Sequence, residues 1–234
     1  METQKYYSEL RDLAIGEGMA VFGVADVKAV RNDFILPDDV KNIFTAGISY
    51  GFHLSEAVLK TIQGAPNQIY YFHYQRVNQL MDQVALKLTS YIQERGYQAL
   101  PIPSSQVIDW TRQLGSVSHR EIARLAGLGW YGRNNLLVNP RFGSQVRYCT
   151  VLTDMPLPTD SPINEDTSEA HACGECHSCG ECHSCEVACP AGAITAAGFN
   201  RDACHAKLKD FMKTERIGQM ICGVCVNACK GRTL

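Results

Sequence analysis

Eleven cysteines dominate the chemistry that this sequence could perform, and their distribution is uneven. Ten of them lie between Cys173 and Cys229, whereas the first 172 residues contain only Cys149. The count is odd and Cys-x2-Cys spacing recurs, so the pattern favours metal-bound thiolates in a reducing compartment over a framework of disulfides. Cys149 lies within a strand pattern, where we expect a buried apolar thiol.

The cysteine run that ends in Cys189-Pro190 has the spacing of bacterial ferredoxins. In that pattern three closely spaced thiolates bind one [4Fe-4S] cluster, and a fourth, before a proline, binds a second cluster. A second set of four cysteines follows it. We therefore predict two clusters, one bound by Cys179, Cys182, Cys185 and Cys229 and the other by Cys189, Cys204, Cys222 and Cys225.

A short duplication accounts for the surplus of cysteines. The hexapeptide GECHSC occurs at residues 174–179 and again, unchanged, at residues 180–185. Only the last three cysteines of the run stand at the ferredoxin distance before Cys189, so we interpret Cys173 and Cys176 as spare thiols.

Zinc is the alternative metal for this region. It is bound by cysteine and histidine in sets of four, and the nearby histidines that could serve are His171, His177 and His183. A run of three cysteines that ends in Cys-Pro is not the pattern of a zinc ribbon, so we expect iron–sulfur clusters instead.

Hydrophobic periodicity predicts the elements that must position these residues. Helices are expected around residues 7–14, 74–92 and 118–126, and strands at residues 19–24, 42–52, 98–102, 136–138 and 146–153. Mixed helices and strands over residues 1–160 predict an α/β sandwich. The polar, proline-containing stretch 156–170 then leads into a cysteine-rich domain at 161–234.

A glycine motif fits the letters of the dinucleotide-binding fingerprint but not its context. That fingerprint needs a strand before the glycines and a helix after them. Here the helical pattern SHREIARLA precedes the motif and LLV follows it. We expect a tight helix-to-strand turn instead. Such a turn can still line the pocket of another cofactor, and the candidate binding residues are Gly127, Gly129, Trp130, Gly132 and Arg133.

Residues 118–159, followed by the double-cluster cysteines, resemble the epoxyqueuosine reductase family and, more distantly, the cobalamin-dependent reductive dehalogenases. The most specific segments are AGLGWYGRNNLL and GSQVRYCTVLTDMPLP, and weaker likeness extends to Phe22-Gly-Val-Ala-Asp26. The resemblance implies a nitroreductase-like α/β domain that holds cobalamin and a ferredoxin-like domain that delivers electrons to cobalt. It also implies reduction of a carbon–oxygen bond on a modified base.

Two departures from the family bear on the reaction. The family's proton donor is an aspartate on the strand before the AGLGW helix, whereas the matching stretch here, residues 101–105, contains no acid and Asp109 is merely nearby. The tRNA-acting members continue into a helical-repeat domain, whereas this sequence stops at Leu234, so tRNA is not the expected substrate. Catalytic residues are left unassigned, and we expect a structural role for His119.

Charge and hydropathy exclude some classes of partner. With 22 Lys and Arg against 24 Asp and Glu, the net charge of −2 gives no global reason to expect nucleic acid or an anionic membrane. No apolar run approaches the roughly 18 residues of a membrane-spanning helix. We expect a cytoplasmic protein.

The sequence thus predicts an iron–sulfur oxidoreductase that relays electrons through two [4Fe-4S] clusters to a cobalamin, with a small molecule or modified base as substrate. The alternative is a non-enzymatic, ferredoxin-like carrier that passes electrons to a separate corrinoid or flavin protein. Either function needs an external electron donor of the ferredoxin or flavodoxin type. The basic segment Lys207, Lys209, Lys213 and Arg216 is either a solvated helix face or a docking site for that donor.

Overall fold

The computed structural model describes residues 2–163 and 182–230. Chain contacts divide the molecule into two compact units. The first contains the described residues of 1–52, 78–128 and 147–162, and the second contains those of 53–77, 129–146 and 163–234. Two segments from before residue 160 thus belong to the unit that holds the C-terminal residues. The consecutive domains expected at 1–160 and 161–234 stay a prediction.

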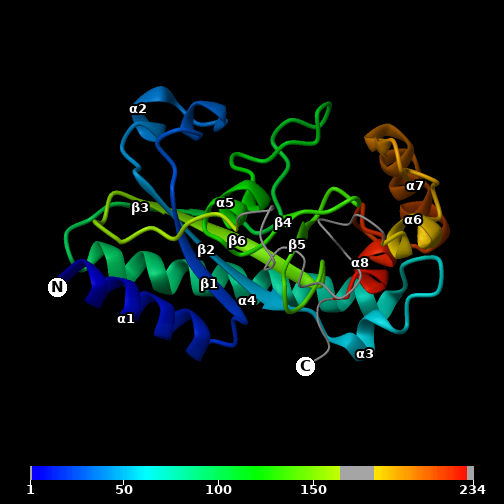
Figure 1. Cartoon of the computed structure of the whole chain (residues 1–234), viewed down its shortest axis with the longest axis horizontal. Coiled ribbons are helices and arrows are strands. Elements are labelled where there is room, and N and C mark those ends of the chain that lie inside the picture. The colour runs from blue at the N-terminus through cyan, green and yellow to red at the C-terminus, as the bar shows by residue number, and fades with distance from the viewer. Residues whose placement is uncertain (1, 164–181, 231–234) are drawn as a thin grey trace. The chain divides into compact units, whose positions relative to one another are not determined.

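A four-stranded sheet with the strand order β1-β2-β6-β3 forms the centre of the first unit (Figure 1). β1 pairs with β2 and β3 pairs with β6, in both cases antiparallel. All four strands were expected from the sequence, and their bounds are Val21–Asp26 (β1), Ala46–His53 (β2), Ala99–Ile102 (β3) and Val146–Thr153 (β6).

The remaining described elements are mostly short. The longer helices are α1 (Glu2–Gly16), α4 (Gln68–Gln93) and α7 (Arg201–Thr214). The shorter helices are η1 (Arg31–Asp33), α2 (Asp38–Lys41), α3 (Glu56–Leu59), α5 (His119–Leu125), α6 (Ser184–Ala188) and α8 (Val224–Ala228). Two further antiparallel pairs of short strands are β4 (Trp130–Tyr131) with β5 (Leu137–Val138), and β7 (Ile194–Thr195) with β8 (Gly198–Phe199). The mixed α/β class is confirmed, while the nitroreductase-like and ferredoxin-like descriptions stay predictions.

The long helix α4 begins earlier than its apolar periodicity predicts, at Gln68 rather than near Tyr74. The Asn67 side chain accepts a hydrogen bond of 2.9 Å from the Tyr70 N–H, which is the role of an N-cap residue. Tyr70 and Tyr74 are both buried, so the apolar face of the helix extends to this earlier start.

One face of the sheet packs on α1 and α4. Phe22 and Tyr50 are directly opposite each other on β1 and β2 and therefore share a face. Phe22 makes an edge contact with Tyr7 of α1, with ring centroids 5.5 Å apart. Tyr50 donates a hydrogen bond of 2.9 Å to the Met81 carbonyl oxygen of α4, and both residues are fully buried. This face is the apolar core of the first unit.

The opposite face packs on α5 at two glycines. Side chains alternate along a strand, so Gly23 and Gly47 face away from α4. A Cβ at Gly23 would lie 2.6 Å from the Ala126 carbonyl oxygen, and one at Gly47 would lie 2.9 Å from the Ile122 side chain. Only glycine therefore allows α5 to lie this close to the sheet.

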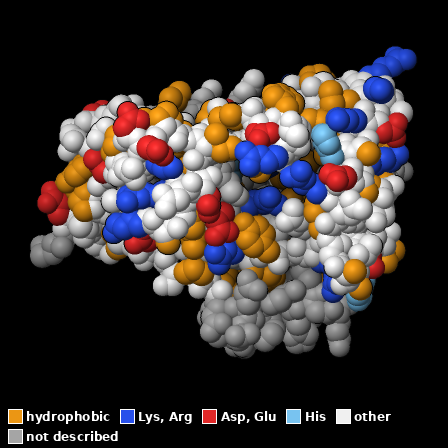
Figure 2. Space-filling view, turned by 90° about the horizontal axis from the view of Figure 1, so that it is seen from above, with side chains coloured by type: hydrophobic (Ala, Val, Ile, Leu, Met, Phe, Trp, Pro, Cys, Tyr) orange, Lys and Arg blue, Asp and Glu red, His pale blue; other side chains and the backbone are white. Residues whose placement is uncertain are grey.

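The surface shows no segregation of charge on the face in Figure 2, where acidic and basic side chains are interspersed. This mixture matches the small net charge of −2. In the described ranges, no helix has both the length and the apolar character required to cross a bilayer.

A polar network anchors the loop that follows β3. Ser104 is buried, and its backbone N–H donates a hydrogen bond of 2.8 Å to Asp82 Oδ1. Its hydroxyl donates to the Asn78 carbonyl oxygen at 3.2 Å, and its own carbonyl oxygen accepts a bond of 2.8 Å from Arg147 Nη2. Backbone and side chain of Ser104 are thus both fixed by neighbours.

His119 holds the same loop from α5. Its Nδ1 lies 2.9 Å from Thr150 Oγ1, and its Nε2 donates to the Pro103 carbonyl oxygen at 3.0 Å, since a carbonyl can only accept. Burial of the ring lowers the pKa of His119 to about 4; the Arg147 charge also lowers it, while the Pro103 carbonyl and Asp82 oppose the shift. The neutral imidazole is a structural residue, as expected.

Replacing His119 with Gln should make stability less sensitive to pH. The unfolded chain keeps the ordinary histidine pKa of 6.5, so between pH 7 and 5 it binds more protons than the folded chain. Lowering the pH over this window should cost wild type about 1–2 kcal/mol that His119→Gln does not lose. Urea unfolding at both pH values measures this difference, and an equal loss in the two proteins would contradict the assignment.

Candidate metal centre

Seven of the eight predicted cluster ligands lie among the described residues, all in the second unit. Cys179 lies outside the described residues, together with Cys173 and Cys176. Three of the seven lie within helices, namely Cys185 in α6, Cys204 in α7 and Cys225 in α8, and the others are Cys182, Cys189, Cys222 and Cys229.

α6 and α8 pack against each other (Figure 1), and their cysteines have the same spacing. Each helix holds one cysteine near its start, Cys185 or Cys225, and ends at a second cysteine four residues later, Cys189 or Cys229, as its C-cap residue. Residues four apart lie on one face of a helix, so each short helix brings two thiols to one side.

Neighbouring cysteines affect the ionisation of three thiols in the second unit. Burial raises the pKa of Cys204, and Cys189 raises it further. Burial also raises the pKa of Cys222 to about 11, with Cys204 and Cys189 adding to the shift. For Cys225 burial again raises the pKa most, followed by Cys222, Cys204, Cys185 and Cys189. These influences link all four cysteines of one predicted ligand set, but Cys185 of the other set also acts on Cys225, so the partition between the two clusters stays a prediction.

Two cysteines of the other predicted set meet at a small hydrophobic cluster. Cys229 is buried with Trp130 and Val138, and Cys182 packs against the same group. Trp130 and Val138 are paired across the β4–β5 hairpin. The hairpin therefore contributes to the surroundings of these thiols.

A backbone donor supports Cys189. The Ala193 N–H donates a hydrogen bond of 3.3 Å to Cys189 Sγ, across a turn in which Gly192 has φ +57°. Hydrogen bonds to a ligand sulfur tune the potential of a bound cluster.

The contact between the loop at residues 139–145 and Cys229 was not predicted from the sequence. The Ser144 N–H donates a hydrogen bond of 3.2 Å to the Cys229 carbonyl oxygen. Gly143 has φ +59°, and the Cys229 carbonyl oxygen occupies the place that a Cβ would take. The glycine in PRFGSQ was the available signal, because a side chain there would push Cys229 away.

The donor set fits a [4Fe-4S] cluster. Thiolates this close together repel one another, and burial disfavours each charge separately. Iron supplies the positive charge that offsets both costs, and thiolates are the ligands that such clusters take. Loading the site would release the thiol protons.

Within residues 2–163 and 182–230, no three His, Cys, Asp or Glu side chains are placed to share a single metal ion. His183, one of the histidines considered for zinc, instead pairs with Glu186, with 2.7 Å between Nδ1 and Oε2. His171 and His177 lie outside the described residues.

Cys149 stands apart from the described cysteines of the second unit. It is fully buried in β6 and donates to the Ile102 carbonyl oxygen at 3.3 Å. The burial of this thiol is as expected, and it raises the pKa of Cys149 to about 11.

The glycine motif forms the expected helix-to-strand turn between α5 and β4. Gly127 has φ +70°, and a Cβ there would lie 2.5 Å from the Ser161 carbonyl oxygen. At Gly129 the Val138 carbonyl oxygen takes the place of a Cβ. The chain's own carbonyl groups therefore occupy both positions, and neither glycine offers a vacant cradle for a cofactor.

The other candidates of this motif have different surroundings. The Gly132 N–H donates a hydrogen bond of 2.8 Å to the Leu136 carbonyl oxygen and so closes the hairpin turn. Trp130 is fully buried in the cluster with Cys229, and Arg133 is partly buried. A cofactor-binding role for Gly127, Gly129, Trp130, Gly132 and Arg133 stays a prediction.

Asp109, the acid nearest to residues 101–105, is held by residues of its own loop. Its carboxylate accepts hydrogen bonds from the N–H groups of Arg112 (2.8 Å) and Thr111 (3.0 Å) and pairs with the Arg112 side chain at 2.6 Å. The Arg112 N–H and side chain hold the pKa of Asp109 below its ordinary value, which favours the ionised form.

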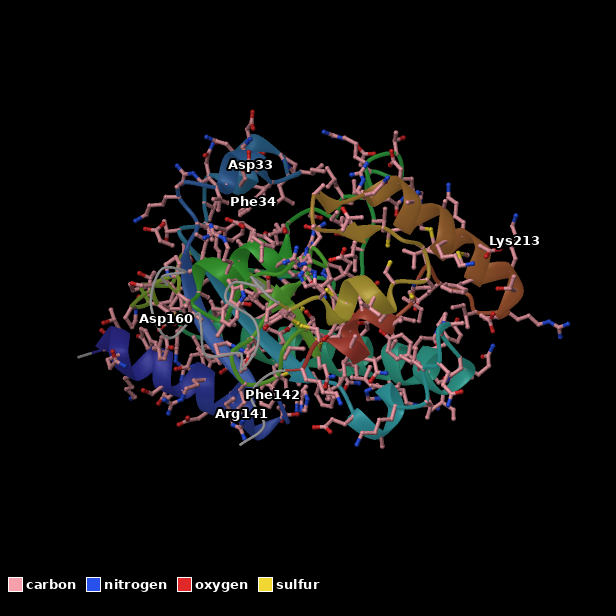
Figure 3. All side chains as sticks on the ribbon, turned by 45° about the vertical axis from the view of Figure 1, so that its right-hand side comes forward. Asp33, Phe34, Arg141, Phe142, Asp160 and Lys213 are labelled. Atoms are coloured by element: carbon pink, nitrogen blue, oxygen red, sulfur yellow. The ribbon has the colours of Figure 1, made fainter. Side chains whose placement is uncertain are left out.

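The basic segment after Cys204 is partly neutralised. Lys207 pairs with Asp210 at 2.8 Å and lies 4.8 Å from the centre of the Phe211 ring. Lys209 and Lys213 are exposed, and Lys213 extends away from α7 (Figure 3).

No family model and no curated protein matches the sequence. Solved structures do match. The catabolic reductive dehalogenase NpRdhA, in complex with 3-bromo-4-hydroxybenzoic acid, is 16% identical with a TM-score of 0.75, over 97% of this chain and 32% of its own.

Epoxyqueuosine reductases match as well. The Bacillus subtilis enzyme is 18% identical with a TM-score of 0.62, over 96% of this chain and 64% of its own. The Streptococcus thermophilus enzyme is 15% identical with a TM-score of 0.60, over 97% of this chain and 67% of its own. The chain spans about a third of the dehalogenase and about two thirds of the reductases. It has, over nearly its whole length, the fold that reductive dehalogenases and epoxyqueuosine reductases share.

Proposed function

We propose that the chain is an iron–sulfur oxidoreductase that passes electrons through two [4Fe-4S] clusters to drive a reductive reaction. The observation that carries this proposal is that one unit gathers four cysteines, Cys189, Cys204, Cys222 and Cys225, whose neighbours affect the ionisation of three of them. Burial and mutual repulsion disfavour the thiolate form of Cys204, Cys222 and Cys225 unless a cationic centre joins them. Cys182, Cys185 and Cys229, with Cys179, would bind the second cluster.

Two clusters in one small unit suit an electron relay. Iron–sulfur clusters transfer electrons singly and do little bond chemistry themselves, so the reduction takes place at another centre. The external donor would be a protein of the ferredoxin or flavodoxin type. The exposed Lys209 and Lys213 on α7 would attract its acidic surface.

The proposed electron acceptor is cobalamin. Support comes from the shared fold, since one matching dehalogenase structure is described as B12-dependent. Cobalamin would supply the cobalt centre at which the substrate is reduced. We assign no residue to it, because the chain's own carbonyl groups fill the space beside Gly127 and Gly129.

The substrate is proposed only by class, as a small molecule or a modified base. The matching structures include a halogenated aromatic acid in one case and a tRNA stem loop carrying epoxyqueuosine in another. In this chain the loop after β3 has Ser104 tied into a network, and Asp109 is held ionised. We therefore expect little turnover of epoxyqueuosine in tRNA.

The absence of an acid from residues 101–105 favours a second candidate. In that case the chain is a carrier that transfers electrons to a separate corrinoid or flavin protein. Both candidates need the clusters, and they differ in whether the chain itself retains a corrinoid.

Paired cysteine replacements test the ligand set and its partition. The double variant Cys204→Ala with Cys225→Ala should lose one cluster and keep about half of the iron, because both residues serve the same cluster. Cys225→Ala with Cys229→Ala should lose nearly all iron, because it damages both clusters. Iron per chain after anaerobic reconstitution is the measurement.

Cys149→Ala is the matched control, since this buried thiol lies in the other unit and should leave the iron content unchanged. Equal iron in the two double variants would show that the partition is wrong. Full iron in both would show that the ligand set is wrong.

Retention of cobalamin separates the enzyme from the carrier. If the chain binds cobalamin, the reconstituted protein should keep about one corrinoid per chain through gel filtration. Chemical reduction of the clusters should then produce the spectrum of cob(I)alamin. A protein that keeps no corrinoid, but whose clusters reduce an external acceptor, would be the carrier.

A further inference from the structure

The indole N–H of Trp130 is a buried hydrogen-bond donor that finds no acceptor among the described residues. The side chain is fully buried, and its Nε1 makes no hydrogen bond within the described part of the chain. An indole N–H that is buried in this way usually finds a partner, and leaving it unpaired costs stability. The position therefore calls for an acceptor that the described residues do not supply.

The surroundings of Trp130 narrow the choice of acceptor. Trp130 belongs to a hydrophobic cluster whose other described members are Val138 and Ile163, which are apolar, and the cysteines Cys229 and Cys182. Sulfur is thus the only atom type in this group of side chains that can accept a hydrogen bond. Both cysteines belong to the same predicted cluster.

The backbone of this corner is fixed. Trp130 pairs with Val138 across the β4–β5 hairpin, and the Val138 carbonyl oxygen takes the place of a Cβ at Gly129. The strand pairing and this close approach together set the position of the backbone that carries the indole ring.

We propose that the indole N–H of Trp130 donates a hydrogen bond to a sulfur atom of the [4Fe-4S] cluster bound by Cys182 and Cys229. Trp130 is then a residue that tunes this cluster rather than one that binds another cofactor. The inference rests on the proposed function, because it needs the cluster. A hydrogen bond to sulfur stabilises the additional negative charge of the reduced cluster and so raises its reduction potential.

Trp130→Phe tests the role by removing the N–H and keeping an aromatic ring. At a fixed potential, the ratio of reduced to oxidised form should fall about tenfold for one cluster, which is about 59 mV for a one-electron couple. The other cluster should titrate as in wild type. Iron content should be retained, and the apoprotein should lose less stability than an ordinary core truncation, because an unpaired donor is removed.

The chain offers a matched control. Its other tryptophan, Trp110, is 65% exposed, and Trp110→Phe should leave both potentials unchanged. This variant also makes Trp130 the single tryptophan. Labelling it with indole ¹⁵N should then give a ¹⁵N coupling to the reduced cluster in pulsed electron paramagnetic resonance, a readout that does not require the Trp130 replacement to fold.

Unchanged potentials in a Trp130→Phe protein that holds all its iron would overturn the inference. Should that variant lose iron, the labelled Trp110→Phe protein decides, and absence of the ¹⁵N coupling would overturn it. Failure of wild type to form two clusters is a different result, because it refutes the proposed function before any variant is compared.

Discussion

Repulsion among closely placed cysteine thiolates is the constraint on which the cysteine-rich part of the second unit depends. Burial is the largest cause of the raised pKa of Cys225, and four other cysteines raise it further, so its thiolate is strongly disfavoured in the protein alone. A hydrophobic core would not gather sulfur atoms in this way, because thiols contribute little to packing that Val or Ala would not. A bound cationic cluster reverses the sign of the interaction and makes the arrangement stabilising.

The architecture follows from the need to bring distant thiols together. α6 and α8 each place two cysteines four residues apart on one face, and α7 adds Cys204. Five residues are too few for such helices to be stable alone, so they depend on their packing against each other and, under the proposed function, on the metal that they would bind. The hairpin β4–β5 and the loop at Gly143 then fix Cys229 through its backbone and its neighbours.

Local signals allowed much of the first unit to be predicted. In its strands, apolar and polar residues alternate or apolar residues form a continuous run. The Ser118 side chain accepts a hydrogen bond from the Glu121 N–H, so α5 begins at the cap that the sequence predicts. The start of α4 was missed because its cap, Asn67, stands well before the recognisable apolar repeat. The assignment of residues 53–77 and 129–146 to the second unit depends on contacts between distant segments, which no periodicity reports.

The candidate site was likewise predicted only in part from the sequence. Cysteine spacing predicts which residues bind iron, because ligand geometry restricts spacing along the chain. Cysteine spacing does not identify Trp130. In the sequence this residue lies within the glycine motif, and only the structure shows that Cys229 and Cys182 are its neighbours. The likeness to epoxyqueuosine reductases suggested an acid near residues 101–105, but only the hydrogen bonds of Asp109 show that this carboxylate stays ionised.

The most direct test of the central claim is the type of iron centre in the wild-type chain. Mössbauer spectroscopy of protein reconstituted anaerobically with ⁵⁷Fe should show all bound iron as [4Fe-4S] clusters, about eight irons per chain. After reduction, electron paramagnetic resonance should show two clusters that interact magnetically, because their ligands share one unit. Mononuclear iron, a single isolated cluster, or stoichiometric zinc in place of iron would contradict the account.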